Sequence, residues 1–278
     1  MPRRLRFPAA FLLVLALAWG AGYAPAADAG PAAANPDWRL NGAYFKKAAS
    51  DILVAGTAPL RWRGGDLLTF AAFAGTTGLL FAFDGDLYQA IQDRKTDASR
   101  DASKIISKIG NGGYLAGFLA VLYGGGEILD SRSLRRTALT GLESLIAASA
   151  VNLAFKIAAG RARPYAGEGP ESFHPFSFKG RYTSFASGDA AGAFAVATTI
   201  ALNSDSFWID SLAYLAAGLA AFYRVHDRKH WPSDVFAGSA IGYFTARAVD
   251  ALNRNGDGLR VSFQAGPGRG AVIVAVAF

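Results

Sequence analysis

Six apolar stretches, each long enough to form a helix, follow one another along the chain and limit what it can fold into. They are rich in Ala, Leu, Phe and Gly. Apolar runs of this length favour helices over strands. They span residues 66–83, 113–130, 136–160, 188–203, 207–223 and 233–251. The sequence therefore predicts an all-α fold, a bundle of about six core helices. Residues 84–112 are highly charged, which predicts an exposed helix or loop.

The segments outside this bundle have different compositions. Residues 1–27 have a basic start, a short apolar run and small residues near Ala27, which predicts a signal peptide, with an uncleaved anchor as the alternative. Residues 28–65 are predicted to be an N-terminal arm, loose where Ala, Pro and Asn dominate, and residues 66–251 the helical domain. In residues 252–278 apolar residues alternate on both sides of a Gly-Pro-Gly turn, which predicts a short β-hairpin.

The relation of the helices to a membrane has two interpretations. Within the six apolar stretches, the longest uncharged run, Leu67 to Phe83, has 17 residues, fewer than the ~20 that a membrane span usually needs. The positive-inside rule would place the arginine-rich end near Arg132 in the cytoplasm, whereas cleavage after a signal peptide would leave residue 28 onward outside. A helical domain folded outside the cytoplasmic membrane and resting on it removes this conflict. We favour that interpretation over a multi-span protein.

The composition narrows the classes of function. The formal net charge is +7, but the basic residues are scattered instead of clustered in blocks, so nucleic-acid binding is not indicated. An anionic substrate or an anionic lipid surface fits this charge better. The chain has no cysteine, which excludes disulfides, thiolate metal sites and cysteine catalysis.

A polar segment between the last two apolar stretches contains two histidines and several charged residues. Pro232 is suited to the first position of the following helix, which places Asp234 in its first turn. From there Asp234 can accept a hydrogen bond from one ring nitrogen of His230 and leave the other nitrogen free to attack an electrophile. Arg224 ends the preceding helix and can point into the same space. The segment therefore predicts a nucleophilic histidine.

Two further clusters fall at the same end of the bundle if the helices alternate in direction. Lys156 and Arg163 follow the third apolar stretch, and Ser187-Gly188 opens the fourth. Ser187 is a good N-cap, and the free N–H groups of a first helical turn bind anions. Each cluster alone has a simpler explanation, as a helix cap or as charges that complement a helix dipole. Their coincidence with Arg224 favours an anion-binding site.

The order and spacing of these residues resemble the three-part signature of the type-2 phosphatidic acid phosphatase and vanadium haloperoxidase superfamily. The resemblance covers roughly residues 66–250. It implies an all-helical core and metal-independent phosphoester hydrolysis without a cofactor. It also implies that His230 is the nucleophile, forming a phosphohistidine, and that Asp234 orients it. The groups implied to hold the phosphoryl oxygens are Lys156, Arg163, Arg224 and the amides of Ser187 and Gly188.

One departure from the family pattern concerns catalysis directly. Asp189 stands where the family has the histidine that protonates the leaving group. Nearby cations should keep a carboxyl at this position ionised. Three outcomes follow: a preference for leaving groups that need little protonation, such as one phosphate leaving another in a lipid diphosphate; another acid, with His226 or His174 as the candidates; or a relative that binds phosphate groups with little or no turnover.

The sequence thus predicts an exported phosphatase-like protein at the periplasmic face of the cell envelope, acting on phosphate or diphosphate monoesters of lipids or small molecules. An envelope protein that binds anionic head groups is the non-enzymatic alternative. A vanadium-dependent haloperoxidase is the other enzymatic one, although it too relies on the histidine that Asp189 replaces.

Overall fold

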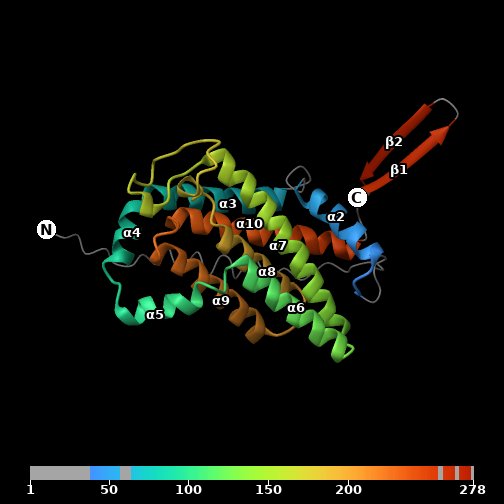
Figure 1. The fold of residues 1–278 in the computed structure, drawn as a ribbon, viewed down its shortest axis with the longest axis horizontal. Helices are drawn as coiled ribbons and strands as arrows, with labels where there is room; N and C mark the ends of the chain where they lie inside the picture. Colours follow the sequence, from blue (N-terminus) through green and yellow to red (C-terminus); the bar gives the residue numbers. More distant parts are fainter. Residues whose placement is uncertain (1–37, 57–63, 256–258, 267–268, 277–278) are drawn as a thin grey trace.

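The computed structural model describes residues 38–56, 64–255, 259–266 and 269–276, and its body is all-helical (Figure 1). The predicted helical class is confirmed. The helices are α2 Gly42–Gly56, α3 Gly64–Ala82, α4 Asp84–Gln92, α5 Asp97–Ile106, α6 Gly112–Ile128, α7 Arg132–Ala159, α8 Gly188–Leu202, α9 Phe207–His226 and α10 Pro232–Asn255, with 3-10 turns η2 Pro164–Ala166 and η3 Gly180–Tyr182.

The predicted count of about six helices is too low, because nine α-helices lie within the described residues. The six apolar stretches became α3, α6, α7, α8, α9 and α10. The additional helices α2, α4 and α5 have no long apolar run, so hydrophobicity alone could not find them. Helix α5 is instead defined by its cap, since Thr96 accepts a hydrogen bond from the Ser99 N–H and the Ser99 side chain bonds back to Thr96.

The segment expected to be a loose arm is partly a packed helix. Trp38, Tyr44 and Ala48, in and before α2, form a buried cluster with Leu139 of α7. Polar contacts add to this packing: Lys47 pairs with Asp51 one turn later and also donates to Asn253 Oδ1 of α10 (3.0 Å). Helix α2 is therefore attached to α7 and α10. The predicted signal peptide, residues 1–27, lies outside the described residues.

At the C-terminal end, strands β1 Leu259–Gly266 and β2 Arg269–Val276 are antiparallel. Their register places Leu259 opposite Val276 and Gly266 opposite Arg269.

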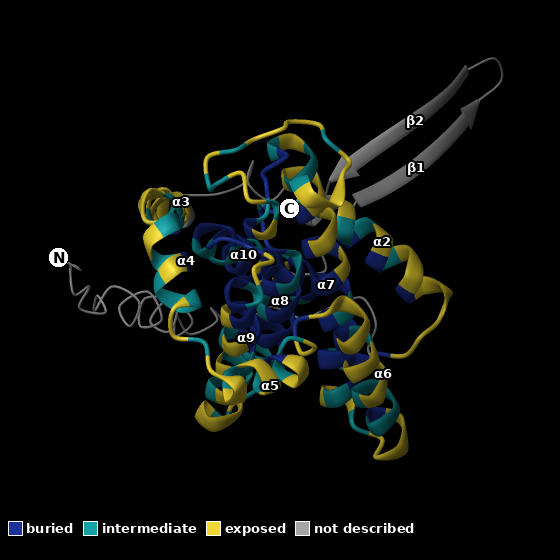
Figure 2. Cartoon of the chain, turned by 60° about the vertical axis from the view of Figure 1, so that its left-hand side comes forward, coloured by how far each residue is buried: buried dark blue, intermediate teal, exposed yellow. Residues whose placement is uncertain are grey.

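Helix α8 lies at the centre of the bundle and packs against α7, α9 and α10 (Figures 1 and 2). Its buried face consists mostly of alanines, and small residues let neighbouring backbones approach closely. A Cβ added to Gly238 of α10 would lie 2.2 Å from the Ser187 carbonyl oxygen, and one added to Gly242 would lie 2.2 Å from that of Ala191. Glycine at these two positions therefore brings the start of α8 onto the first turns of α10.

The outer faces of several helices expose large apolar side chains, which Figure 2 shows as exposed positions around the buried α8–α10 core. Among the described residues, α7 alone is by itself long and apolar enough to cross a membrane, and the bent pair α3–α4 (66°) could form a second span. Examples of the exposed residues are Leu68, Leu79, Phe118, Val121, Ile128, Phe155, Trp208, Leu212 and Leu215.

Candidate active site

The structure brings the eight predicted site residues together at one end of the bundle. This end is formed by the last turns of α7, the segment between α7 and α8, the first turn of α8 and the turn between α9 and α10. Helices α4 and α5 lie beside it, at the left of Figure 1, whereas α2 lies at the other end. The residues are Lys156, Arg163, Ser187, Gly188, Asp189, Arg224, His230 and Asp234.

The start of α8 provides backbone donors. Ser187 is the N-cap, and its hydroxyl accepts a hydrogen bond from the Ala190 N–H (3.4 Å). The Ser187 N–H itself donates to the carbonyl of Asp234 (2.9 Å), which fixes this helix start against α10. A Cβ added to Gly188 would come within 3.7 Å of Lys156 Cε. Lys156 therefore lies beside the first-turn N–H groups of α8, where anions bind.

Several buried donors around this helix start have no acceptor among the described residues. They are Arg163 Nε, Arg224 Nε and the side-chain amide nitrogen of Asn152. The Asn152 side chain lies one turn before Lys156 on α7, and its Oδ1 would be 3.4 Å from a Cβ on Gly188. Because an unsatisfied buried donor is costly, this arrangement suits an anion with several oxygens. Asn152 was not found from the sequence, since a lone Asn within an apolar stretch gives no signal.

Two of the basic side chains are held in place by Thr183. Lys156 Nζ donates to its carbonyl (2.7 Å), and Arg163 Nη2 donates to its hydroxyl (3.1 Å). Both contacts use only part of the donor capacity of these groups. The segment between α7 and α8 therefore orients the cations and leaves donors for a ligand.

His230 is buried, with 2% of its surface exposed, and its ring has a defined orientation. Its Nδ1 lies 2.7 Å from the carbonyl oxygen of Ser184. A carbonyl can only accept, so Nδ1 carries the proton and Nε2 carries the lone pair. Burial, and then the charges of Lys156, Arg163 and Arg224, hold the pKa of His230 well below its ordinary value, against the opposing effect of the Ser184 carbonyl. The imidazole is therefore neutral at neutral pH.

The prediction of a direct hydrogen bond between Asp234 and His230 is wrong. The closest approach is 3.9 Å, from Asp234 Oδ2 to His230 Nδ1. Asp234 instead accepts from the Trp231 N–H (2.9 Å), from Arg161 (2.6 Å) and from the Ser184 hydroxyl. Ser184 thus links the two residues, because its hydroxyl donates to Asp234 while its carbonyl accepts from His230. Asp234 positions the histidine through Ser184.

Arg161 is the largest omission of the sequence analysis. It is fully buried and forms ion pairs with Asp234 (2.6 Å) and with Asp84 at the start of α4 (2.7 Å). Ser233 completes the group, since its N–H and hydroxyl both donate to Asp84. Two features of the sequence point to these residues: Arg161 is a further basic residue between Lys156 and Arg163, and Asp84 directly follows the 17-residue uncharged run. Neither feature specifies that Arg161 pairs with Asp84 and Asp234, which joins α4 to α10.

The histidines considered as substitute acids are engaged elsewhere. His226 is hydrogen-bonded to Asp227 (2.9 Å) and, through its other nitrogen, to the Ser99 hydroxyl of α5 (3.0 Å). His174 lies in the segment between α7 and α8, half exposed, and contacts Glu168 (2.9 Å).

Asp189 forms an ion pair with Arg224, with 2.8 Å between Oδ2 and Nη2. Its carboxylate therefore neutralises part of the charge of one site cation. In the described part of the chain, no group of three or more His, Asp or Glu side chains is arranged to hold a metal ion.

Comparison with known families gives one match. The pattern of the PAP2 superfamily matches residues 137–255, a range that contains all eight predicted site residues. This part of the chain is therefore similar to the PAP2 superfamily. The predicted resemblance is thereby confirmed, and the matched region includes most of α7 and all of α8, α9 and α10, whose ends carry the predicted site residues.

Two solved structures are similar to this chain at low identity. The transmembrane PAP2-type phosphatidylglycerolphosphate phosphatase of Bacillus subtilis is 17% identical, with a TM-score of 0.51, over 66% of this chain and 94% of that one. LpxE of Aquifex aeolicus is 22% identical, with a TM-score of 0.48, over 60% of this chain and 93% of that one. At these identities the comparison concerns the fold. No curated protein matches the chain.

Proposed function

We propose that this protein is a metal-independent phosphatase that hydrolyses phosphate or diphosphate monoesters of lipids through a phosphohistidine on His230. The observation that carries the proposal is the fixed tautomer of His230, with its protonated nitrogen on Ser184, beside a set of buried donors that have no acceptor among the described residues. A nucleophile and an oxyanion site are the two parts that phosphoryl transfer requires.

In the proposed first step, His230 Nε2 attacks phosphorus, the N–P bond forms and the bond from phosphorus to the leaving oxygen breaks. Lys156, Arg163, Arg224 and the first-turn N–H groups of α8 stabilise the charge on the three phosphoryl oxygens. Water then attacks the phosphohistidine, which releases inorganic phosphate and restores the neutral imidazole.

The ion pair between Asp189 and Arg224 limits the choice of leaving group. Because its carboxylate is engaged with Arg224, Asp189 is poorly placed to act as the acid for the leaving group. The structural roles of His226 and His174 disfavour them as substitutes. We therefore favour substrates whose leaving group departs without protonation, such as a lipid diphosphate, in which one phosphate leaves the other. The same ion pair is the observation behind the alternative, a protein that binds phosphate head groups without turnover.

The exposed apolar faces of α3, α6, α7 and α9 support placing the bundle in a bilayer, in contrast to the resting domain favoured from the sequence. Apolar surface of this extent is unfavourable in water but neutral against lipid tails. Lys and Arg residues lie at both ends of the bundle, so the positive-inside rule does not choose between the two orientations. The proposed orientation keeps the site at the periplasmic side of the cell envelope, as predicted from the sequence.

This orientation has a consequence for the N-terminus. Trp38 and α2 lie at the arginine-rich end and would be cytoplasmic, whereas cleavage of residues 1–27 as an exported leader would place them outside. The conflict remains if residues 1–27 stay attached with their basic start in the cytoplasm. The side on which α2 lies therefore tests the orientation. Lys46→Cys, at an exposed position of a chain without cysteine, should be protected from a membrane-impermeant thiol reagent in intact cells, and labelling there would contradict this orientation.

The proposed activity is tested by phosphate release from a lipid diphosphate, a lipid monophosphate and p-nitrophenyl phosphate. The unmodified protein should release phosphate fastest from the diphosphate, and His230→Ala should abolish release from all three. His174→Ala, which removes a histidine outside the proposed machinery, is the matched control and should retain the rate. If the unmodified protein is silent while Asp189→His gains activity, the binding alternative replaces the phosphatase.

A further inference from the structure

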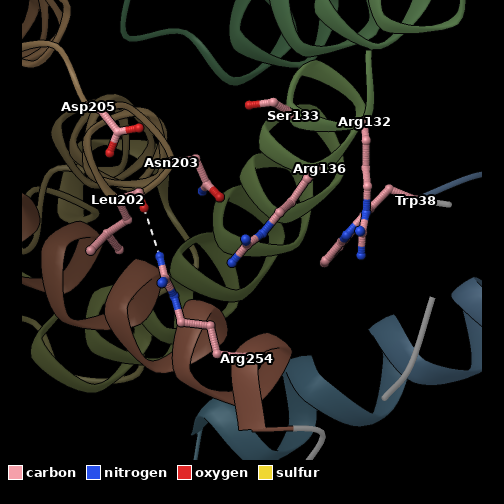
Figure 3. A pocket seen from close by; sticks show the side chains of 8 residues that line it. All are labelled: Trp38, Arg132, Ser133, Arg136, Leu202, Asn203, Asp205 and Arg254. Atoms are coloured by element: carbon pink, nitrogen blue, oxygen red, sulfur yellow. Dashed lines mark hydrogen bonds between the residues drawn. The ribbon is translucent and has the colours of Figure 1, made fainter. Parts of the chain in front are cut away.

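A second pocket lies at the end of the bundle opposite His230. Its cavity has a volume of about 410 Å³. Along α7, Arg132 and Lys156 are 24 residues apart, which corresponds to ~36 Å at 1.5 Å per residue. The pocket is therefore separate from the PAP2 site. It is lined by Trp38, Arg132, Ser133, Arg136, Leu202, Asn203, Asp205 and Arg254, as Figure 3 shows.

Positive charge exceeds negative charge in this pocket, where three arginines face the lining Asp205 and the neighbouring Asp250. Arg254 bonds to Asp250 (2.6 Å) and to the Leu202 carbonyl (2.8 Å), and Arg136 makes a longer contact with the same Asp250 (3.5 Å). Arg132 makes no hydrogen bond or ion pair within the described ranges. One shared carboxylate thus serves two arginines, and the third cation has no acid partner. Both Arg254 and Arg132 repel Arg136 electrostatically.

Arg136 has donors that the surrounding protein does not satisfy. A guanidinium group has five N–H donors, and the long contact with Asp250 uses one of them. Its Nε is buried and has no acceptor among the described residues. The ring of Trp38 lies 5.7 Å from its central carbon, which holds the guanidinium in place without accepting these hydrogens. An oxyanion in the pocket would satisfy this group and reduce the repulsion among the three arginines.

The backbone at the start of α7 adds further donors. Arg132 and Ser133 are its first two residues, and the N-cap Ser131 uses its hydroxyl on the Leu134 N–H. The amide hydrogens of the first two residues therefore lack a partner in the helix. First-turn N–H groups and arginine forks together suit the oxygens of a phosphate group.

We propose that this pocket is a second binding site, which takes a phosphate-bearing anion, supplied by an anionic lipid headgroup or by a free phosphate compound. Both sources present the same oxygens to the arginines. Exposed apolar residues at the end of α6 (Ile128, Leu129) and at the start of α9 (Phe207, Trp208) lie near the pocket in the chain and would accommodate acyl chains. The proposal does not require catalysis at His230.

The test uses the full chain carrying His230→Ala, so that no ligand is turned over. Native mass spectrometry measures retention of phosphatidylglycerol, with phosphatidylcholine as the lipid of no net charge, and equilibrium dialysis measures binding of inorganic phosphate. Arg132→Gln should weaken binding of the preferred ligand about tenfold, a loss of about 1.4 kcal/mol. Arg132 is exposed and its replacement should leave folding intact, which a thermal unfolding curve checks.

Lys46→Gln is the matched control, because it removes the same charge from an exposed position on α2 that does not line the pocket. An Arg132-dependent preference for phosphatidylglycerol identifies a lipid headgroup. Arg132-dependent binding of inorganic phosphate identifies a soluble anion. If Arg132→Gln and Lys46→Gln behave alike with both ligands, the positive charge acts only as a general attraction and the proposal is overturned.

Discussion

At the His230 end of the molecule a fully buried arginine supports the nucleophile, whereas at the opposite end three arginines line an open pocket. Arg161 is fully buried between two carboxylates, and it supports Asp234, Ser184 and finally His230. Arg132, by contrast, is exposed and makes no ion pair in the described part of the chain. Both ends offer cations to an anion, but only one holds a neutral histidine with a fixed tautomer.

This difference indicates that binding a phosphate and reacting with it require different packing. Binding needs donors and charge, which flexible surface arginines supply. A nucleophilic displacement also needs a reacting atom held in one orientation. At the His230 end that orientation depends on a buried polar network and on close contact between α8 and α10. Substitutions that loosen the His230 end should therefore reduce stability and activity far more than equivalent substitutions at the opposite end, which carries the arginine-lined pocket and is called the open end below.

The largest effect is expected from Arg161→Met. The substitution leaves Asp84 and Asp234 buried without a counter-charge, and breaking a buried pair in this way costs about 3–5 kcal/mol. Thermal or chemical unfolding of the purified protein should show this loss, together with loss of phosphate release. Arg132→Gln, the equivalent change at the open end, should stay within about 0.5 kcal/mol of the unmodified protein.

A second variant separates the contribution of charge from that of packing to the stability lost in Arg161→Met. Asp84→Asn added to Arg161→Met removes one of the two stranded charges and should recover part of the lost stability, since neighbours in one network do not act additively. An equal loss from the single and double variants would show that packing, not charge, holds this end together.

The contact between α8 and α10 should be the next most sensitive feature. In Gly242→Ala the new methyl group would meet the Ala191 carbonyl at 2.2 Å, so the helices must separate, at a cost of about 1–3 kcal/mol. Gly218→Ala on α9 is the control, because nothing lies within 4 Å of its new Cβ. It should be neutral or stabilising by up to about 1 kcal/mol, since alanine favours helix. Similar unfolding temperatures for both variants would refute the role given to this contact.

Asn152→Ala should lower kcat/KM for phosphate release about tenfold, equivalent to about 1.4 kcal/mol, if its unpartnered amide binds a phosphoryl oxygen. Asn152→Asp should be worse, because a carboxylate would repel the substrate. Ser149→Ala, one turn earlier on α7, removes only a hydroxyl that bonds to the Leu145 carbonyl. A rate equally reduced by Ser149→Ala would mean that Asn152 acts through the helix and does not touch phosphate.

The sequence could predict the parts of the site that belong to local patterns. Ser187-Gly188 at a helix start, and His230 and Arg224 between apolar stretches, are recognisable because spacing along the chain decides their positions. Parity of the helices then placed the clusters at the same end, and the structure has them there.

Long-range pairings could not be predicted in the same way. Asp234 was assigned directly to His230 because they are four residues apart, but Arg161 and Ser184 compete for its oxygens. The partner of Arg161, Asp84, is 77 residues away in the chain. Helix α2 has no continuous apolar run, and its buried residues Tyr44, Ala48 and Asp51 recur at helical spacing instead. Nothing in one sequence specifies these contacts, because they depend on how helices pack.

The smallest effect, a shift along the pH axis, tests the electrostatic side of the comparison. Reaction requires neutral His230, and its pKa is held well below the ordinary value by burial, then by Lys156, Arg163 and Arg224. The acidic limb of kcat/KM should therefore lie below pH ~6.5, the usual histidine value. Arg163→Gln removes a positive neighbour, so protonation of His230 becomes easier and the acidic limb should move to higher pH, whatever happens to the maximal rate.

The control is Arg132→Gln at the open end, ~36 Å away by helix length, which should leave the acidic limb in place. If the limb in Arg163→Gln does not move, or moves as much in Arg132→Gln, the group that titrates is not a histidine in the field of these cations.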